Sequence, residues 1–396
     1  MTVFLGGGFA AKYLYGGGNF SVPLQWMLGL RRLKLDAFWL EHLPSEGNPA
    51  DDQRKIENFR RQLRAHGLGD RYCLLYHEKP ESTHDLDAIK CIGTSKRELL
   101  ERLAGPNTLL NLSYSLHPPF LLQFERRIFC DLDPSEIIYW MTRMEMGQST
   151  HHEFWTIGLN VNDPGCKLLK MAPSRLPGME MAVLQPSKIQ WRTFYPLVDT
   201  KLYRPQARPR TPKITTIGQW YWGGSVEVDG DFPDLSKKHA FEPYLALPNL
   251  VPKAKFELAM HMSADDPDRE RLRKQAWRLV DPHRVAKTPR SYRDYLATAL
   301  GEFTVIKGVD VSWKTGWLSD RAAAFLATGR PVITEDSGAG KYLPSESGFN
   351  FIRDLDSAAG AVTDVLANWR GRSREARQCA LEVFDSVKNL RKILDL

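Results

Sequence analysis

The fold is decided by residues 318–338, which read LSDRAAAFLATGRPVITEDSG. Ser319 and Asp320 are typical of a helix start, because their side-chain oxygens can accept the unpaired backbone N–H groups of a first turn. An alanine-rich run follows, and Gly329 suits the left-handed conformation that ends many helices. The stretch therefore predicts a helix that begins near Ser319 and ends at Gly329.

A strand and then a polar loop are expected directly after this helix. Pro331 cannot continue the helix, and Val332 and Ile333 carry β-branched side chains suited to a buried parallel strand. The chain then enters residues 334–338, which are polar and flexible. Ligands of open α/β sheets bind beyond the carboxyl ends of the strands, so this loop is predicted to lie at a ligand-binding edge.

The stretch resembles the donor-binding half of GT-B glycosyltransferases. The similarity is greatest to a bacterial family-1/family-4-like group with Gly-Trp-(Phe/Leu)-Ser-Asp-Arg before the helix, a motif that residues 316–321 match. There the helix start faces the diphosphate of a nucleotide sugar, and the acidic loop after the strand faces the sugar hydroxyls. Helix–Gly–Pro–Val–Ile units occur throughout α/β proteins, but polar groups at both ends of one unit favour the functional interpretation. The resemblance implies diphosphate or nucleotide contacts at Gly218, Lys307, Ser319, Asp320 and Arg321, and donor-sugar contacts at Glu335, Asp336, Ser337 and Gly338.

One position departs from the GT-B pattern. Many GT-B donor domains carry a ribose-binding Glu five residues before the helix-ending glycine, and this chain has Ala324 there. The ribose must then be held from elsewhere, with Asp320 as one candidate. The pattern therefore assigns neither retaining nor inverting stereochemistry.

Length and composition favour two domains. The 396 residues exceed one ordinary domain, and 42% hydrophobic and 11% aromatic residues suffice for two cores. The proline-rich residues 203–212 are predicted to be an interdomain linker. The resemblance implies an α/β fold of the GT-B class, with two Rossmann-like domains facing a cleft and a C-terminal helix crossing back. The expected divisions are an acceptor-side domain at 1–205, a nucleotide-sugar donor domain at 206–375 and the returning helix at 376–396.

The second half of the chain carries the expected elements of the donor domain. Strands are predicted at 213–217, 255–260, 303–306 and 349–352, and two final helices at 354–369 and 373–394.

The net charge of +7 is spread along the chain. A moderate basic excess fits an enzyme that handles anionic donors, but solvated surface charge explains it equally well. The charge is compatible with a nucleic-acid acceptor, yet no interleaving of aromatic and basic residues supports one.

Cysteine usage and hydropathy favour a cytoplasmic protein. The five cysteines are scattered without zinc-site spacing, which is typical of free thiols in a reducing compartment. No apolar span reaches transmembrane length, and the N-terminus has no basic segment before an apolar run. The GT-B resemblance implies no metal site and no cofactor, with the nucleotide sugar serving as co-substrate.

The N-terminal half begins with a strand, a glycine-rich loop and a helix. Residues 3–5 form the apolar run, and the loop lacks both the GxGxxG spacing of dinucleotide sites and the Gly-Lys-Ser/Thr of a Walker loop. Such glycines are often simple loop material. The further alternation of strands and helices predicts a doubly wound parallel sheet. The resemblance implies a loop that lines the interdomain cleft at Gly16, Gly17, Gly18 and Asn19.

Asp131-Leu132-Asp133-Pro134 admits two interpretations. Two carboxylates can hold a divalent ion and a diphosphate. Asp133 and Pro134 also form a normal N-cap and first residue of a helix, and we favour this interpretation. A similar motif faces the cleft in the group that the chain resembles, so a binding role stays open.

His151 is the predicted catalytic base. It stands beside His152 before a strand-like segment, and adjacent residues of a strand face opposite sides, so a joint metal site is not expected. A single histidine at a domain rim can deprotonate an acceptor hydroxyl, because its pKa lies near neutrality. The group that the chain resembles tends to have His-Asp at this place, which is a departure.

The leading hypothesis is a glycosyltransferase, hexosyltransferase-like, that moves a sugar from a nucleotide sugar to an acceptor hydroxyl or amine without a metal. One alternative is a nucleotide-sugar epimerase or hydrolase on the same scaffold. Another is a catalytically silent binding protein with the GT-B fold. Sugar, nucleotide and acceptor stay open at this stage.

Overall fold

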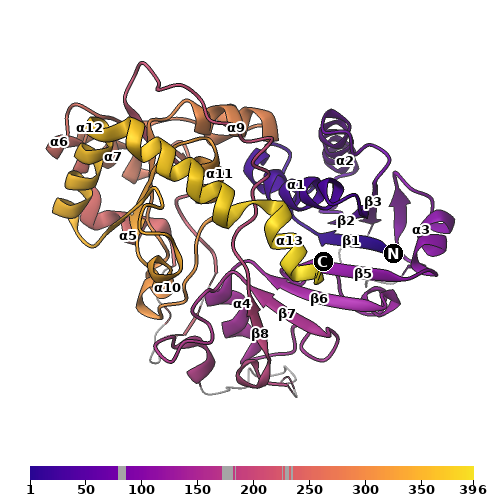
Figure 1. Cartoon of the computed structure of the whole chain (residues 1–396). Coiled ribbons are helices and arrows are strands. Elements are labelled where there is room, and N and C mark those ends of the chain that lie inside the picture. The colour runs from indigo at the N-terminus through magenta and orange to yellow at the C-terminus, as the bar shows by residue number, and fades with distance from the viewer. Residues whose placement is uncertain (79–85, 172–181, 183, 225, 228–231, 233–234) are drawn as a thin grey trace. The chain divides into compact units, whose positions relative to one another are not determined.

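The computed structural model divides the chain into two compact units (Figure 1). Unit 1 holds Met1–Thr156, Met171–Phe194 and Ser386–Leu396, and unit 2 holds Ile157–Lys170 and Tyr195–Asp385. The chain thus passes between the units after residues 156, 170, 194 and 385, whereas the sequence predicts divisions at 205 and 375. The structure describes residues 1–78, 86–171, 182, 184–224, 226–227, 232 and 235–396.

Unit 1 is built on an eight-stranded sheet. In spatial order its strands are β4 (Lys90–Ile92), β3 (Tyr72–His77), β2 (Asp36–Pro44), β1 (Thr2–Gly7), β5 (Asn107–Leu112), β6 (Arg126–Asp131), β7 (Glu153–Thr156) and β8 (Trp191–Thr193). Every neighbouring pair is parallel except β3 and β4. The central strands β1 and β5 are almost fully buried, as is usual in parallel sheets. The order reverses between β1 and β5, which makes their carboxyl ends the topological switch point of this sheet.

The helices of unit 1 follow local capping rules. They are α1 (Gly17–Arg32), α2 (Pro49–Ala65), α3 (Lys96–Leu103), α4 (Pro134–Met141) and α13 (Ser386–Leu394). Asn48 caps α2 by accepting the Asp51 backbone N–H at 3.2 Å. Ser95 and Glu98 form a capping box at α3, which satisfies two backbone N–H groups at once.

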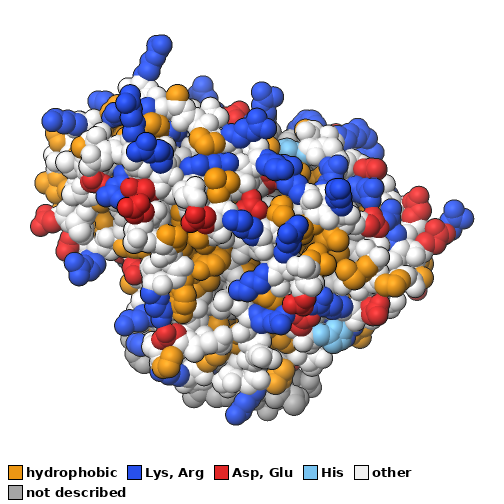
Figure 2. All heavy atoms as spheres, viewed as in Figure 1, with side chains coloured by type: hydrophobic (Ala, Val, Ile, Leu, Met, Phe, Trp, Pro, Cys, Tyr) orange, Lys and Arg blue, Asp and Glu red, His pale blue; other side chains and the backbone are white. Residues whose placement is uncertain are grey.

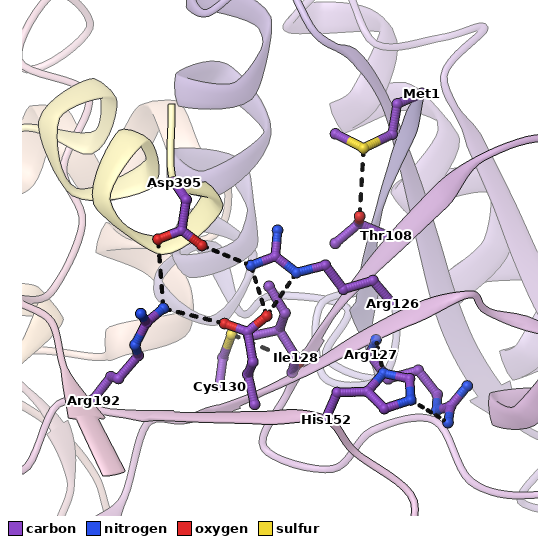
Figure 3. Close-up of polar contacts among 10 residues, drawn as sticks. Met1, Thr108, Arg126, Arg127, Ile128, Cys130, His152, Arg192 and Asp395 are labelled. Atoms are coloured by element: carbon purple, nitrogen blue, oxygen red, sulfur yellow. Dashed lines mark hydrogen bonds and ion pairs between the residues drawn. The ribbon is translucent and has the colours of Figure 1, made fainter. Parts of the chain in front are cut away.

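The C-terminal helix α13 is fixed within unit 1 along its length and just after its end. A Cβ on Gly29 of α1 would lie 2.5 Å from Leu390 Cδ1, so glycine permits the close approach of the two helices. Asp395 pairs with Arg126 at 3.0 Å and with Arg192 at 3.5 Å (Figure 3). The end of the chain therefore belongs to unit 1, as the returning helix predicts.

Unit 2 is built on a six-stranded, fully parallel sheet. In spatial order its strands are β11 (Arg278–Leu279), β10 (Lys255–His261), β9 (Lys213–Gln219), β12 (Gly301–Phe303), β13 (Val332–Glu335) and β14 (Phe349–Ile352). The chain fills one side of β9 first and then returns to fill the other side from β12. The carboxyl ends of β9 and β12 are therefore the switch point of unit 2. Two parallel Rossmann-like sheets confirm the predicted α/β class.

The long helix of unit 2 covers the predicted helix 354–369 and the start of the predicted helix 373–394. The helices are α5 (Lys237–Phe241), α6 (Leu247–Leu250), α7 (Pro267–Lys274), α8 (Pro282–Val285), α9 (Pro289–Ala297), α10 (Gly308–Ser312), α11 (Asp320–Ala327) and α12 (Leu355–Cys379). The break predicted between 369 and 373 corresponds to a kink at Asn368, where φ is −108° and ψ is 23°, so that α12 is bent rather than divided. Figure 1 shows this long helix as one element. A π-helical turn, Ala380–Phe384, then leads to α13.

Residues 203–212, predicted to be a linker, are fastened onto unit 2. Arg330 is fully buried and donates to the carbonyl of Ala207 at 3.0 Å. Arg377 donates to the carbonyl of Tyr203 at 2.9 Å. The two guanidinium groups donate to carbonyl groups of an irregular segment that has no helix or strand partner for them. This segment is therefore part of unit 2.

The described surface carries mixed charge. Lys and Arg side chains lie across the visible face with Asp and Glu among them (Figure 2). Of the helices that the structure describes, none combines the length and the apolar character needed to cross a bilayer.

Candidate donor-binding site

Helix α11 begins at the carboxyl edge of the unit 2 sheet, as predicted. Ser319 is its N-cap, and the hydroxyl oxygen accepts the Arg321 backbone N–H at 3.1 Å. Residues 322–327 are buried, and Gly329 has φ of 72°, the left-handed geometry expected at this helix end. The N-terminal end of the helix, which carries partial positive charge, therefore lies at this edge together with Arg321.

Arg321 and Lys237 form a cationic pair at the switch point. Arg321 forms an ion pair with Glu302 of β12 and donates to Thr304 Oγ1 at 2.9 Å. Lys237, the first residue of α5, donates to the Val305 carbonyl at 2.8 Å. The segment after β9, the loop after β12 and the start of α11 thereby meet at these two cations.

Gly218, near the end of β9, lies against both cations. A Cβ on this residue would be 3.7 Å from Lys237 Cε and 3.8 Å from Arg321 Nη1. These are ordinary contact distances, so a small side chain would fit. Its absence leaves the backbone open to a ligand held by the pair. The structure thus brings together the predicted residues Gly218 and Arg321.

Burial and neighbouring charges set the ionisation of this cluster. Burial lowers the pKa of Lys237 to about 7, and repulsion from Arg321 adds to the effect. Burial opposes the charge on Arg321, but the Glu302 carboxylate outweighs it and raises the pKa of the guanidinium. Burial raises the pKa of Asp320 to about 6. An anion placed beside Lys237 would favour its charged form.

Glu335, at the end of β13, braces the loop that follows β12. Its Oε2 accepts the Ile306 backbone N–H at 3.0 Å, and its Oε1 accepts the Tyr244 hydroxyl at 3.4 Å. Burial raises the pKa of Glu335. Since Lys237 holds Val305 and Glu335 holds Ile306, the loop is fixed between the two side chains.

Asp336, Ser337 and Gly338 shape the predicted sugar-binding loop. Asp336 is exposed and accepts the Gly338 backbone N–H at 2.8 Å. Ser337 is buried and donates to the Trp317 carbonyl at 2.7 Å. Gly338 has φ of 92°, and a Cβ on it would lie 2.2 Å from Asn160 Nδ2. Asp336 is therefore the one of the three that presents a polar side chain to solvent.

Lys307 joins the loops that follow β9 and β12. Its Nζ lies 4.9 Å from the centre of the Trp222 ring, a cation–π arrangement. Trp222 is 43% exposed and its backbone N–H donates to Ser236 Oγ at 2.8 Å. Burial and Arg321 lower the pKa of Lys237, and the charge of Lys307 lowers it further. Lys307, a predicted phosphate contact, is therefore near enough to the pair to act on it.

His151 is packed inside unit 1. The residue is 7% exposed, and its ring packs edge-on against the ring of Phe129 with 5.1 Å between the ring centres. Nδ1 donates to the Gly147 carbonyl at 2.8 Å, and Nε2 accepts from Asn111 Nδ2 at 3.1 Å. Burial lowers the pKa of His151 to about 4. The residue also precedes β7, at the amino end of a strand, whereas ligands bind at carboxyl ends. This geometry argues for a packing role and against the predicted role as base.

The neighbouring His152 faces Arg127 (Figure 3). His152 Nδ1 accepts the Arg127 backbone N–H at 3.1 Å, and Nε2 lies 2.8 Å from Arg127 Nη2. Burial lowers the pKa of His152, and the guanidinium lowers it further. Across the described residues, no three His, Cys, Asp or Glu side chains gather as a metal site would require.

The residues predicted to form a glycine loop are instead the start of α1, near the switch point of unit 1. Gly16 is the N-cap of α1, Gly17 begins the helix, and Gly18 and Asn19 lie in its first turn. The Gly16 backbone N–H donates to the Tyr13 carbonyl at 3.1 Å. A Cβ on Gly16 would lie 2.6 Å from Tyr13 Cβ, so this turn requires a glycine.

The Asp131–Asp133 motif forms a helix start. Asp131 is buried, and it accepts the Asp133 backbone N–H at 2.8 Å and the Thr156 hydroxyl at 2.5 Å. Asp133 occupies the N-cap position of α4 and Pro134 its first turn, but the Asp133 side chain makes no capping hydrogen bond. The helix start was predicted, and the carboxylate that stabilises the turn is that of Asp131.

From the sequence, a lysine of the Lys237-Lys238 pair could contact phosphate, but an exposed surface pair is the commoner explanation, and Glu302 was not predicted at the site. Lys237 belongs to a Lys-Lys pair, a signal that surface lysines also produce. Glu302 is a lone acid in a buried strand, which signals that a partner must compensate its charge. Neither signal identifies Arg321 as the common neighbour, because only the assembled sheet brings the three together.

Comparison with known proteins supports the fold. No protein-family model and no curated protein matches the chain. Among solved structures, the whole chain is similar to Anabaena HepE in complex with UDP and glucose, with 10% identity, a TM-score of 0.56 and 98% of that chain covered. It is also similar over its whole length to sucrose-phosphate synthase from Thermosynechococcus elongatus, with 12% identity, a TM-score of 0.52 and 98% covered. A third similar structure is an alpha-glucosyltransferase in complex with UDP and a 13-mer DNA, with 9% identity, a TM-score of 0.54 and 99% covered; all of this chain is again covered.

These neighbours are GT-B structures, so the two Rossmann-like units have the GT-B fold that the resemblance implied. The structural similarity establishes the fold alone, because a shared fold does not imply a shared function. The activity has to be argued from the site.

Proposed function

We propose that this protein is a glycosyltransferase that moves a sugar from a nucleotide-sugar donor to an acceptor hydroxyl or amine without a metal ion. The supporting observation is the pair Lys237 and Arg321 beside Gly218, at the switch point of a GT-B unit. The similar structures in complex with UDP make a uridine diphosphate sugar the first donor to test.

The pair is suited to stabilise a leaving diphosphate. As the bond from the anomeric carbon to the diphosphate oxygen breaks, negative charge grows on the diphosphate. The Arg321 guanidinium, the charged form of Lys237 and the N-terminal end of α11 can all stabilise that charge. Lys307 would supply a third cation. These cations would take the place that a divalent ion has in other transferases, which is our reason for proposing metal independence.

The carboxylates at the same edge are suited to hold the rest of the donor. Glu335 and the exposed Asp336 would accept hydrogen bonds from the sugar hydroxyls, and Ser337 and Gly338 would keep that loop in shape. Asp320 is the proposed ribose contact. The bond from the anomeric carbon to the diphosphate oxygen breaks, the new bond forms between the anomeric carbon and the acceptor oxygen or nitrogen, and the proton of the acceptor passes to the released diphosphate or to water.

Thermal unfolding with added ligands tests the donor site. UDP and UDP-glucose are expected to raise the Tm of the protein, because a ligand that binds only the folded state stabilises it. The double variant Arg321→Met with Glu302→Gln removes the cation without leaving a buried charge unpaired, and it should lose the shift. Arg372→Met is the matched control, since Arg372 pairs with Asp364 and Glu375 away from the site.

Two results would contradict the proposed donor site: no nucleotide or nucleotide sugar stabilises the wild type, or the double variant keeps the full shift. Product analysis then separates the enzyme classes. UDP release that requires an acceptor indicates a transferase, release without one indicates a hydrolase, and a changed sugar without release indicates an epimerase. Activity that survives EDTA supports metal independence.

A further inference from the structure

The loop that follows β1 is held in one shape by a buried carboxylate. Glu41 is fully buried, and its Oε1 accepts the backbone N–H groups of Ala10 at 2.6 Å and Ala11 at 2.9 Å. Its Oε2 accepts the indole N–H of Trp39 at 3.0 Å. Hydrogen bonds to an acidic side chain in a buried setting are strong, so the start of the loop is fixed to β2.

The second half of the loop is held as well. Asn58 of α2 donates to the Leu14 carbonyl at 3.1 Å. The Gly16 N–H closes a turn onto the Tyr13 carbonyl, and this turn leaves room for no side chain at Gly16. The loop is therefore anchored before, within and after its central residues.

This anchored loop presents two aromatic side chains to solvent. Tyr13 is 42% exposed and Tyr15 is 41% exposed, although the alanines that precede them are buried. Lys12 is exposed, with its ammonium 5.9 Å from the centre of the Tyr13 ring. Single exposed apolar residues are common and need no explanation. Two phenol rings on one anchored loop are different, because little conformational freedom is lost when a ligand covers them.

The position of the loop identifies a ligand-binding edge. It follows the carboxyl end of β1, next to the point where the strand order of unit 1 reverses. Ligands of open α/β sheets bind at such points. Unit 2 presents its cationic pair at the corresponding point of its own sheet, so the site in unit 1 is available for a different ligand.

We propose that Tyr13 and Tyr15 form the acceptor platform and that the acceptor is an uncharged saccharide. This rests on the proposed glycosyltransferase function. A pyranose ring has an apolar C–H face that packs on an aromatic ring, and its hydroxyl groups can bond the phenol oxygens. A nucleic acid would also stack on tyrosine, but it needs a row of cations along its backbone, and Lys12 is the single cation among residues 8–19.

A printed array of neutral and sulfated oligosaccharides, with an oligothymidine strand beside them, tests this proposal on the full-length protein. The wild type is expected to bind at least one neutral oligosaccharide. The double variant Tyr13→Ala with Tyr15→Ala should lose roughly tenfold or more in affinity, whereas Tyr13→Phe with Tyr15→Phe, which keeps both rings, should retain most of it. Leu100→Ala, at an equally exposed apolar residue of α3, is the matched control.

The proposal is overturned if the wild type binds no neutral saccharide, if the double alanine variant binds as well as the wild type, or if only oligothymidine or sulfated glycans bind. The UDP-induced rise in Tm is measured on the same variants. It is expected to be unchanged in all of them, because the donor site lies in unit 2. If UDP does not raise the Tm of the wild type, the proposed donor site is contradicted instead. Failure of the acceptor proposal and failure of the donor site therefore give different results.

Discussion

Lys237 makes the proposed donor site sensitive to pH. In the free protein burial lowers the pKa of this ammonium group to about 7, so the neutral form dominates above that pH. A bound diphosphate favours the charged form, and binding above pH 7 must therefore take up a proton. The affinity for UDP is expected to fall by up to roughly tenfold per pH unit above about 7, until the pKa of the liganded lysine is passed. Titration calorimetry in buffers of different ionisation enthalpy measures both the affinity and the proton uptake.

Variants at neighbouring lysines isolate the cause of this pH profile. Lys237→Met removes the titrating group and should weaken binding while flattening the profile. Lys238→Met is the matched control, because Lys238 pairs with Asp268 at 3.1 Å and should leave the profile unchanged. If the affinity of the wild type for UDP does not change with pH, Lys237 does not contact the diphosphate.

Glu302 is expected to be important for stability because it compensates Arg321. Glu302 is fully buried, accepts a hydrogen bond from the Thr216 hydroxyl at 3.0 Å and forms the ion pair with Arg321. Glu302→Leu leaves a largely buried guanidinium without a counter-charge, and we expect the free energy of unfolding to fall by about 3–5 kcal/mol. Urea unfolding followed by circular dichroism measures the change. Adding Arg321→Met should restore much of the loss; a double variant no more stable than Glu302→Leu would show that the pair is not its cause.

At the scale of the elements, the end of α11 depends on a residue that can adopt positive φ. Gly329 has φ of 72°, and a Cβ on it would lie 2.8 Å from Ser373 Oγ. Gly329→Ala is therefore expected to lower the free energy of unfolding by about 1–2 kcal/mol. Gly360→Ala, within α12 and with nothing within 4 Å of the added Cβ, should instead raise it by roughly 0.5–1 kcal/mol. Urea unfolding compares the two, and changes of the same sign would contradict this account.

Elements with complete local signals were predictable from the sequence. Helix α11 has its N-cap and its terminal glycine, and β14 occupies the predicted residues 349–352. The strand β12 was predicted at 303–306 but runs from Gly301 to Phe303. The apolar residues 305–306 resemble a strand, yet side chains from α5 and β13 hold their backbone as a loop. Tertiary contacts of this kind leave no local pattern.

The candidate sites were predictable to a different extent. Arg321 was found because it belongs to a contiguous motif. The contacts of Lys237 and Glu302 depend on how β9, β12 and α5 meet, which spacing along the chain does not encode. His151 was selected for its ordinary pKa and its place beside a strand, but its burial and its bond with Asn111 depend on the folded loop around it.

At the scale of the whole molecule, unit 1 is assembled from three separate segments of the chain. The last segment supplies α13, whose side chains Leu390, Ile393 and Leu394 are buried. The middle segment, which lies between the two parts of unit 2, supplies Phe194, which packs edge-on against Trp26 at 5.4 Å. The boundary that proline content predicts near residue 205 therefore separates unit 1 from α13, the helix that completes its core.

A fragment of residues 1–205 is therefore expected to be much less stable than the same fragment extended by residues 386–396 through a Gly/Ser linker. Without α13, the aliphatic side chains that pack on α1 are missing, and burial of each is worth about 1.5–3 kcal/mol. Their sum is comparable to the whole stability of a small domain. Thermal unfolding by circular dichroism compares the two fragments, and Leu390→Asp with Ile393→Asp in the extended fragment should reproduce the bare one. Because Asp395 and the ion pairs of Figure 3 are kept in that control, equal melting of the control and the intact extended fragment would assign the stabilisation to charge instead of apolar packing.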